Sequence, residues 1–546
     1  MTNVTVTSFL GVEAESFVGT VSAASNVPVS GLISFTTASA STTVTIEHTN
    51  HGAVTGSFVI LSNVTFGSGS TYNSLITLLT NEFEITVINA NSYNITLSSN
   101  AGFDLVNSGT SDADYLLNKG GTSQLLGTGW GADTWGAGGW GLAASQGIVL
   151  EEELRLWQQD NFGEDLIILP RNGQLYYWDN TNGLTSRAFP FATRTSDAPT
   201  QSRRLIVSDR DRHVLVFGTT PLGGGDIDPL LIRFSSQEDP FTWTPTSTNT
   251  AGDIRVGSGS EIIAAVETRR EIIVITDTSV HSLQFIGPPF TFGITQISGN
   301  ITIRNANAAI ANNDAVFWMG IDRFYLYDGR VQPIPCTVRD YVFSDFDESN
   351  FEKVVAGLNT EFGEVVWFYP SESGGTGEND RYVVYNYEQK IWYYGNLARS
   401  AWLDRGIYEY PFGATHDTDS VAPRQLYTHE FGNNADDVAI TSFIDSSPID
   451  IADGEQFSLV RRFIPDIDFS RSSDGATKQA TYTLKGQRFP GTGFTTNDTF
   501  TVSSTTSQKN SRVRGRSFGI KVESNGLGVA WRLGSNRVDV KTDGRR

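Results

Sequence analysis

The chain has 546 residues, of which 39% are hydrophobic and 18% are charged, and its formal net charge is −21. This composition is that of a soluble globular protein with room for roughly two to four domains and a sizeable core. No apolar run reaches the about 18 residues of a membrane-spanning helix, and the single cysteine, Cys336, excludes internal disulfides and metal–thiolate clusters.

The charge is unevenly distributed along the chain. Residues 1–120 hold one Lys and eight Asp or Glu, whereas residues 511–546 hold nine Lys or Arg and three Asp or Glu. The acidic charge of the rest of the chain argues against tight binding to DNA, because affinity for phosphate requires Lys and Arg. It is compatible with a surface that DNA slides past, and equally with charge that keeps a large protein soluble.

Small polar residues dominate the first part of the chain. Residues 1–30 are rich in Val, Ser, Thr, Ala and Gly and are interpreted as an arm or a short strand pair, and they lack the features of a signal peptide. Residues 31–118 are predicted to form a small β domain, or knob, with strands at 41–48, 57–66, 82–88 and 92–98. For His48 and His51 a structural turn is favoured over a metal site, because no carboxylate or Cys stands at zinc-site spacing.

A tryptophan–glycine run follows at residues 129–141, which read GWGADTWGAGGWG. Trp130, Trp135 and Trp140 are spaced five residues apart, which is neither the helix nor the strand period. The run is therefore predicted to be an irregular loop, in which glycine permits turns with positive φ and each Trp brings a large apolar surface.

From residue 150 to about 440 one unit recurs loosely. It consists of an apolar β run, a turn, an aromatic-rich β run and a polar loop, as in LIIL and LYYW joined by Pro-Arg-Asn-Gly. Irregular repeats of about 40–50 residues, each unable to bury its own face, indicate a β-propeller. We assign the propeller body, with five or six blades, to residues 119–440; two packed β-sandwiches are the alternative architecture.

Residues 441–546 are predicted to form a C-terminal β-meander or sandwich region, with strands at 457–469, 480–489 and 518–541. Arg512, Arg514 and Arg516 alternate in SRVRGRS, so on a strand they share one face. The expected fold class is thus all-β: an irregular β-propeller body with a small inserted N-terminal β domain and a C-terminal β region.

The search for an active site finds no motif. The sequence has no Gly-x-Ser-x-Gly elbow and no Walker loop, and none of its six His fits a metalloprotease pattern. His213, near Asp209 and Asp211, is interpreted as part of an exposed turn with ion pairs, and Cys336 as buried packing. Acidic residues are plentiful, but a glycosidase needs two that meet in space.

The aromatic runs WFY, WYYG and YYW favour blade packing over stacking of sugars or bases. From these observations we expect no enzyme activity, no cofactor and no metal.

From residue 129 onward the chain resembles the tail-hub or nozzle proteins of short-tailed phages, also called packaged-DNA stabilisation proteins. The text that carries the resemblance includes GTGWGADTWGAGGWG, LRLWQQDNFGEDLIILPRNGQLYYWD, FWMGIDRFYLYDG, RYVVYNYEQKIWYYGNLARSAWLDRG and the C-terminal WRLGSNRVDVKTDGRR. It covers roughly residues 120–546. Residues 31–118 resemble, through the weaker pattern HG…G…V…F.V…Y.I, a small β module often inserted in phage virion proteins.

This resemblance implies a structural protein of the virion tail that is assembled in the host cytoplasm. Its subunits are expected to form a hexameric ring beneath the portal and adaptor proteins, close to tail fibres or tailspikes. The ring closes the channel on packaged double-stranded DNA and conducts it at ejection, without sequence-specific binding. The Trp130–Trp140 run then becomes a packed connector or inter-subunit contact, and Arg512, Arg514 and Arg516 a docking surface for an acidic ring face.

Two other functions remain open at this point. One is a propeller enzyme that degrades host polysaccharide, which requires paired carboxylates in a funnel at the propeller centre. The other is a receptor-binding tail adhesin with residues 31–118 as the binding tip.

Overall fold

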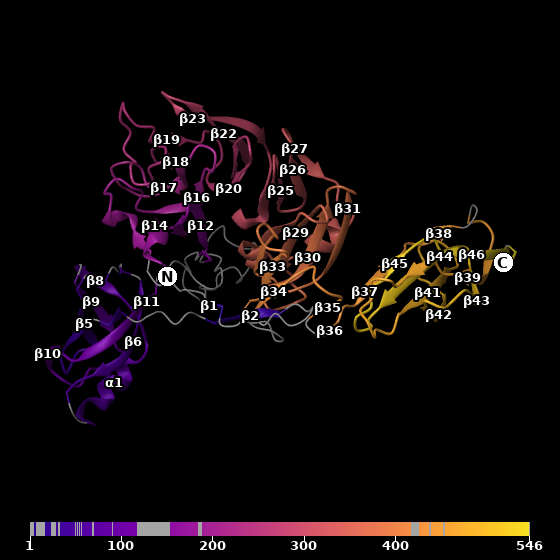
Figure 1. Cartoon of the computed structure of the whole chain (residues 1–546), viewed down its shortest axis with the longest axis horizontal. Coiled ribbons are helices and arrows are strands. Elements are labelled where there is room, and N and C mark those ends of the chain that lie inside the picture. The colour runs from indigo at the N-terminus through magenta and orange to yellow at the C-terminus, as the bar shows by residue number, and fades with distance from the viewer. Residues whose placement is uncertain are drawn as a thin grey trace, which may run out of the picture. The chain divides into compact units, whose positions relative to one another are not determined.

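The computed structural model describes most of the chain (Figure 1). The described residues are 5–6, 17–22, 29–30, 33–49, 51, 53, 55, 57–67, 70–89, 91–116, 153–154, 156–183, 188–416, 425–435, 438–450 and 454–544. The run with Trp130, Trp135 and Trp140 lies outside them. Within the described part, no helix is both long and apolar enough to cross a membrane.

Internal contacts divide the chain into two compact units. The first comprises Met1–Thr7, Val21–Asp404 and Ala414–Arg424, and the second comprises Ser8–Thr20, Arg405–Gly413 and Gln425–Arg546. The domain boundaries inferred from the sequence remain predictions, and each unit is described by itself below.

The described part of residues 29–116 in the first unit contains two antiparallel sheets and a short helix. One sheet has the order β10 (Leu105–Ser108), β4 (Ser34–Thr37), β5 (Thr43–Glu47), β9 (Ser92–Thr96), β8 (Thr86–Asn89). The other has the order β3 (Val29–Ser30), β11 (Thr110–Leu116), β6 (Phe58–Thr65), β7 (Glu82–Glu84), and α1 (Asn73–Leu79) follows the 3₁₀ turn η1 (Ser70–Tyr72). Alternate side chains such as Phe35, Val44 and Ile46 enter a common core with Leu75 and Leu79 of α1. The helix was not predicted.

Five four-stranded antiparallel sheets follow in chain order, each built from four consecutive strands. The first sheet consists of β12 (Trp157–Phe162), β13 (Asp165–Pro170), β14 (Tyr176–Trp178) and β15 (Phe189–Pro190), and the second of β16 (Ser202–Val207), β17 (Val214–Thr219), β18 (Asp228–Phe234) and β19 (Gly252–Arg255). The third sheet consists of β20 (Ile262–Glu267), β21 (Ile272–Thr276), β22 (Ser279–Gly287) and β23 (Thr291–Gly299), and the fourth of β24 (Ala309–Asn312), β25 (Ala315–Met319), β26 (Phe324–Tyr327) and β27 (Val331–Ile334). The fifth sheet consists of β28 (Val355–Asn359), β29 (Glu364–Pro370), β30 (Asn379–Asn386) and β31 (Ile391–Asn396).

The connections between these strands hold short helical segments. They are η2 (Asn180–Asn182), η3 (Phe191–Thr193), η4 (Ala306–Ala308), α2 (Arg339–Phe343) and η5 (Glu348–Lys353).

The first strands of successive sheets lie side by side, from β12 through β16, β20 and β24 to β28. Figure 1 shows the labelled strands β12 to β31 running in order around the body. Consecutive four-stranded sheets whose first strands meet in this way form a propeller-like arrangement, as the repeat pattern predicted.

Burial explains why the second strand of each sheet is apolar at nearly every position. In β17 all six residues are buried. Val214 and Val216 pack with the preceding sheet, including Ile167 and Leu169, whereas Leu215 and Phe217 pack with the following sheet. A strand covered on both faces has no solvent side, so its sequence does not alternate.

The same two-sided packing continues along the body. In β25, Val316 and Trp318 join the core that contains Ile273 of the preceding sheet, and Phe317 and Met319 join the core that contains Trp367 of the following sheet. Each hydrophobic core is therefore shared by two neighbouring sheets, and no sheet buries its surface alone.

The N-terminal arm contributes strands. β1 (Thr5–Val6) pairs with Val21 and Ser22 of β2 (Phe17–Ser22), within the segment for which an arm or a short strand pair was predicted. The other end of β2 pairs with β34 (Gln425–Thr428), Phe17 lying opposite Tyr427. An N-terminal strand is thus hydrogen-bonded to a strand that follows the five sheets in sequence; β32 (Ala401–Leu403) and β33 (Phe412–Ala414) precede β34.

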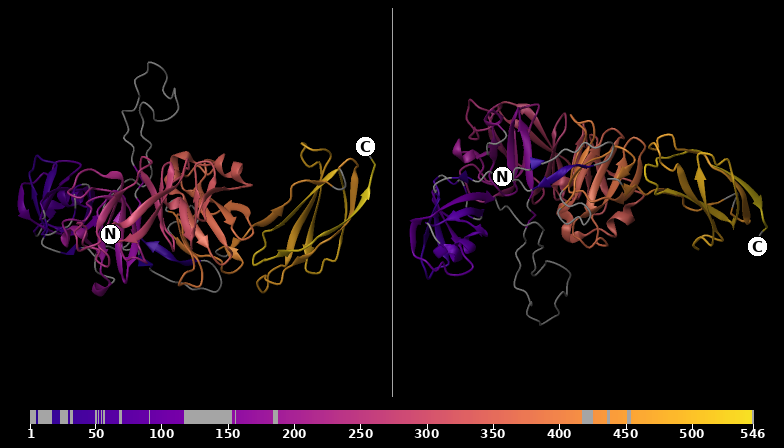
Figure 2. Two further views of the ribbon diagram at one scale, coloured as in Figure 1. Left: turned by 90° about the horizontal axis from the view of Figure 1, so that it is seen from above. Right: turned by 60° about the horizontal axis from the view of Figure 1, so that its bottom comes forward.

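The second unit ends in a β-sandwich, drawn in yellow in Figure 2. One sheet has the order β37 (Ser442–Asp445), β44 (Ser517–Ser524), β41 (Gln479–Gln487), β42 (Thr496–Ser503), with β38 (Ile449–Asp450) also on β44. The other consists of β43 (Lys509–Gly515), β39 (Ser458–Ile464) and β46 (Arg537–Thr542); β35 (Asn434–Ala435) pairs with β36 (Val438–Ala439), and β40 (Ile467–Asp468) with β45 (Arg532–Leu533). Val460 and Phe463 of one sheet share a core with Tyr482 and Val522 of the other.

Candidate functional site

The starts of the first strands surround a cavity of about 330 Å³ in the first unit. The segments that line it come from all five sheets: the residues before β12, the start of β16, the residues just before β20, the segment before β24, and η5 before β28. Its lining is unusually rich in charge, with four arginines and four glutamates: Arg171, Arg203, Arg204, Arg304, Glu153, Glu261, Glu348 and Glu352. We call this space the central cavity.

Two arginines join three of the glutamates. Nη1 of Arg171 lies 2.6 Å from Oε1 of Glu352, and its Nη2 lies 3.1 Å from Oε1 of Glu153. Arg203 bridges Glu153, at 3.5 Å, and Glu261. Glu352 also accepts a hydrogen bond from the backbone N–H of Leu154 at 2.7 Å. Both oxygens of this carboxylate therefore have partners, as a side chain that is only 6% exposed requires.

Arg304 holds the fourth glutamate. Its guanidinium pairs with both carboxylate oxygens of Glu348, and Nη2 lies 2.9 Å from Oε1. The same guanidinium donates to the backbone carbonyl of Ile321 and lies over the Phe346 ring, 4.1 Å from its centre. Each glutamate of the central cavity is therefore bound by an arginine.

Arg204 differs from the other three arginines. Its residue is 7% exposed, its Nε donates to the carbonyl of Ile263 at 3.1 Å, and its buried Nη1 has no acceptor among the described residues. No carboxylate of the described part of the chain pairs with it. Burial, together with repulsion from Arg171 and Arg203, lowers the pKa of the Arg204 guanidinium to about 9.

This arrangement limits what the cavity can do chemically. A retaining or inverting glycosidase uses one carboxyl group as an acid and a second as a base or nucleophile. In the central cavity each carboxylate instead accepts hydrogen bonds from an arginine in an ion pair. Four carboxylates do line this one cavity, but three arginines, Arg171, Arg203 and Arg304, bind all of them.

The opposite ends of the first strands carry a second group of acids. Glu267 ends β20 and lies near Asp160 of β12 and Asp209. Burial, followed by repulsion from the two aspartates, raises the pKa of Glu267 to about 7, and burial also raises the pKa of Asp160.

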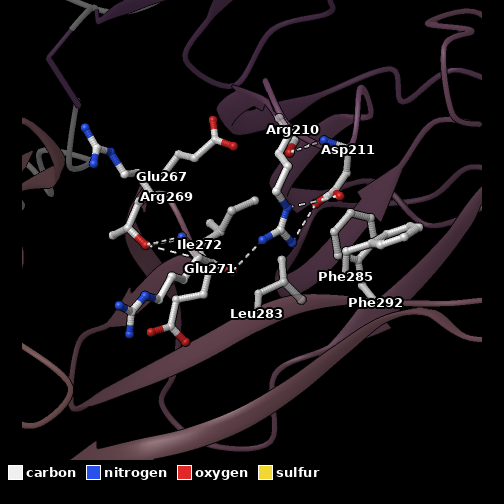
Figure 3. A pocket seen from close by; sticks show the side chains of 12 residues that line it. Arg210, Asp211, Glu267, Arg269, Glu271, Ile272, Leu283, Phe285 and Phe292 are labelled. Carbon is white, nitrogen blue, oxygen red and sulfur yellow. Dashed lines mark hydrogen bonds and ion pairs between the residues drawn. The ribbon is translucent and has the colours of Figure 1, made fainter. Parts of the chain in front are cut away.

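Glu267 borders a small cavity of about 10 Å³ (Figure 3). Figure 3 shows Arg210 paired with Asp211 beside Phe285 and Phe292 on its wall. This volume holds about one water molecule, so it is too small for a substrate.

The structure shows the surroundings of four single residues noted in the sequence: His213, Cys336, His48 and His51. His213 is fully buried, against the prediction of an exposed turn, because Phe234, Phe285 and Phe292 surround its ring. Its nitrogens face the carbonyl of Asp211 at 2.8 Å and Oγ1 of Thr250 at 3.1 Å, and burial lowers its pKa.

Cys336 packs against the core shared by the last two sheets, and burial raises its pKa to about 11, so it is a protonated thiol at neutral pH. His48 lies 2.5 Å from the Tyr115 hydroxyl, and His51 lies 2.9 Å from the carbonyl of Asn89. A Ser–His contact also exists, with 2.9 Å between Oγ of Ser279 and Nε2 of His281, but both side chains are buried and neither lines the central cavity.

The aromatic runs noted in the sequence differ in their burial. Trp367, Phe368 and Tyr369 are buried, as blade packing requires, whereas Tyr393 and Tyr394 of the outer strand β31 are exposed by 38% and 39%. The prediction of core packing is therefore wrong for these two tyrosines, because an outermost strand has no further sheet to cover it.

The predicted arginine surface lies in the second unit. Ser511, Val513 and Gly515 of β43 are buried, and Arg512 between them is exposed. Arg514 is half-buried, with Nε 2.5 Å from Oδ2 of Asp543 and its guanidinium 4.2 Å from the centre of the Phe457 ring.

The guanidinium of Arg516 lies over the same Phe457 ring at 5.0 Å. Two of the three arginines thus have partners within the chain.

Sequence reasoning missed the central cavity. The available signal was a charged residue near the start of each of four first strands: Glu153 before β12, Arg203 and Arg204 at the start of β16, Glu261 before β20 and Glu352 before β28. The loose spacing of the repeats hid this recurrence.

Comparisons with known proteins give no family. No protein-family model and no curated protein matches the chain. Among solved structures, the extracellular domain of BT4673 from B. thetaiotaomicron matches at 10% identity over 61% of this chain and 43% of its own, with a TM-score of 0.30.

The endosialidase of phage phi92 matches at 11% identity over 62% of this chain and 46% of its own, with a TM-score of 0.17. A mutant of the apocarotenoid oxygenase of Synechocystis matches at 9% identity over 72% and 92%, with a TM-score of 0.30. The chain spans less than half the length of the first two.

Proposed function

We propose that the chain is a structural protein of a short phage tail, a hub or nozzle subunit that assembles into a ring beneath the portal and adaptor. The ring holds packaged DNA and conducts it at ejection. The proposal rests on the sequence text that resembles such proteins, and two features of the structure support it.

The observation that carries the proposal is an apolar edge on the second unit. Val438, Ile440, Phe443, Ile444 and Ile449 are each 49–65% exposed within twelve consecutive residues. Three of them lie on β37 and β38, the strands that form one edge of the sandwich sheet. Exposed apolar residues that gather on an unpaired sheet edge are typical of surfaces that another chain covers.

The second supporting feature is the state of the central cavity. The enzyme hypothesis requires two carboxyl groups that face the substrate, and all four glutamates there are already engaged by arginines. Four carboxylates around one cavity are still the observation that favours a polysaccharide-degrading enzyme, which is therefore the second candidate.

DNA conduction agrees with the net charge of −21, since an acidic wall repels phosphate and does not retain the genome. Tail fibres or tailspikes are proposed as neighbours on the outside of the ring.

The test is the mass of the purified full chain by mass photometry over a range of concentrations. We expect oligomers that approach six copies, and their loss in Phe443→Ser/Ile449→Ser. Leu527→Ser is the matched control, because Leu527 is 57% exposed in the same unit but lies off the apolar edge. All three proteins should melt at the same temperature, since exposed substitutions change the free energy of unfolding by about 0.5 kcal/mol or less. A strictly monomeric chain that depolymerises capsular polysaccharide would favour the enzyme.

A further inference from the structure

The guanidinium of Arg204 is the charged group of the central cavity that the ion pairs leave out. The residue is 7% exposed, and the single hydrogen bond of this guanidinium among the described residues runs from Nε to the carbonyl of Ile263. Its Nη1 is buried and lacks an acceptor. A buried charge is stable only when it is paired and hydrogen-bonded, so the cavity is incomplete around Arg204.

Two neighbours add to this shortage of acceptors. The Nε atoms of Arg203 and Arg304 are also buried without a partner in the described part of the chain. A guanidinium donates hydrogen bonds and cannot accept them. The unmet groups on these three arginines therefore all require acceptors.

The chemistry of the unmet groups decides which ligand fits. A cation entering the cavity meets glutamates that arginines already hold, so it finds no free carboxylate. An anion meets Arg204, which no carboxylate of the described residues pairs with: Glu352 and Glu153 lie near enough to favour its charge, but Arg171 and Arg203 oppose it and already hold both glutamates. The planar guanidinium presents parallel N–H groups that match the oxygens of a carboxylate or a phosphate.

The size of the cavity indicates a ligand larger than a bare ion. Its volume of about 330 Å³ falls at the lower end of the range for small-molecule sites, roughly 300–1,000 Å³. Ile262, Ile303 and Phe351 supply apolar wall next to the arginines. A ligand with one anionic group and a compact organic part uses both features.

We propose that the central cavity is a binding site for a small organic oxyanion, a phosphate monoester or a carboxylate, and that Arg204 is the residue that binds its anionic group. Arg171, Arg203 and Arg304, fixed by their glutamates, shape the site around it. Because the ligand ties together segments from five sheets, it stabilises the propeller-like body. This inference is independent of the proposed tail role.

The experiment uses the purified full chain and three probes: inorganic phosphate, ribose 5-phosphate and acetate. Isothermal titration calorimetry at constant ionic strength, balanced with sodium chloride, gives the stoichiometry and Kd for each probe. Thermal unfolding is followed in parallel, because a ligand that binds only the folded state raises Tm with its concentration. We expect one site per chain and a Tm that rises with the bound probe and not with chloride. Tighter binding of ribose 5-phosphate than of acetate identifies a phosphate monoester, and the reverse order a carboxylate.

Arg204→Met keeps the bulk of the side chain and removes the charge. It should weaken binding by about tenfold or more and abolish the rise in Tm. Arg210→Met is the matched control, because Arg210 is half exposed and lies outside the central cavity; it should bind as the wild type does.

Should Arg204→Met fail to fold, Arg204→Lys retains a cation and is expected to bind with intermediate Kd. No heat and no rise in Tm for any probe on the wild-type chain would show that water satisfies these arginines, and would overturn the proposal. Equal binding by wild type and Arg204→Met would overturn the role of Arg204.

Discussion

Nη1 of Arg171 lies 2.6 Å from Oε1 of Glu352, and the two residues are 181 positions apart in the sequence. Arg171 stands in the turn after β13 of the first sheet, and Glu352 lies in η5 ahead of the fifth. The ion pair therefore joins the two ends of the series of five sheets across the central cavity. Their side chains are only 12% and 6% exposed, so neither charge can turn to water if its partner is removed.

Arg171→Met should consequently destabilise the body strongly. Removal of one partner from a buried ion pair leaves an uncompensated charge and costs about 3–5 kcal/mol. Chemical denaturation followed by tryptophan fluorescence measures the change. Arg323→Met is the matched control, since its pair with Asp322 is about half exposed, and it should change the free energy of unfolding little. Equal losses in the two variants would mean that the pair does not hold the sheets together.

Glu267 gives the stability a pH dependence of known sign. Its pKa is about 7 in the folded protein against an ordinary value of 4.5. Between these values the folded state keeps a proton that the unfolded state has lost, so this contribution is complete below pH 4.5 and is lost as the pH rises through 7.

Glu267→Gln removes this dependence. Because the residue is partly exposed and solvent screens the effect, we expect the variant to gain about 1 kcal/mol over the wild type at pH 8 and nothing at pH 4. Urea denaturation at the two pH values measures this, with Glu372→Gln at an exposed position as the control. A gain at pH 4 that equals the gain at pH 8 would contradict the assignment.

Because Gly357 of β28 has no side chain, it leaves room for the indole ring of Trp402. A Cβ at this position would overlap the side chain of Trp402, whose Nε1 donates to the carbonyl of Leu358 at 2.7 Å. Gly357→Ala should therefore cost about 1–3 kcal/mol, as overpacking does. Gly257→Ala, where no atom lies within 4 Å of the added Cβ, should change the free energy of unfolding little. Thermal unfolding compares the two, and equal Tm values would show that Trp402 moves aside freely.

A substitution of Arg512 can test docking of the second unit without disturbing its folding. It is exposed on β43, whereas Arg514 is tied to Asp543 and packs on Phe457. If this face docks on an acidic ring surface, Arg512→Glu should weaken assembly onto the adaptor without changing Tm. Co-sedimentation with the adaptor measures assembly, and Lys478→Glu, at an exposed position ahead of β41, is the control. Normal assembly of the Arg512 variant would remove this residue from the docking surface.

Much of the strand order could be predicted from the sequence, because apolar runs are bounded by turn residues. The run 57–66 corresponds to β6, Phe58–Thr65, and the run 92–98 to β9, Ser92–Thr96. The hairpin at Pro-Arg-Asn-Gly forms with Ile168 opposite Tyr176, and Asn172 has a φ of +56°. The helix α1 was missed because its seven residues, NSLITLL, are too short to show a helical period.

The candidate site could not be predicted, because five distant segments build it. No local pattern reports that Arg171 meets Glu352, or that Arg204 meets no carboxylate. The burial of His213 was missed for the same reason, since its polar neighbours Asp209 and Asp211 indicate a surface turn while its aromatic cover comes from β18, β22 and β23.

The most direct test of the central claim is negative-stain electron microscopy of the full chain mixed with its adaptor ring. The account predicts rings of six copies with a central channel, and their absence in Phe443→Ser/Ile449→Ser. Isolated single particles at every concentration, from a chain that cleaves polysaccharide, would contradict it.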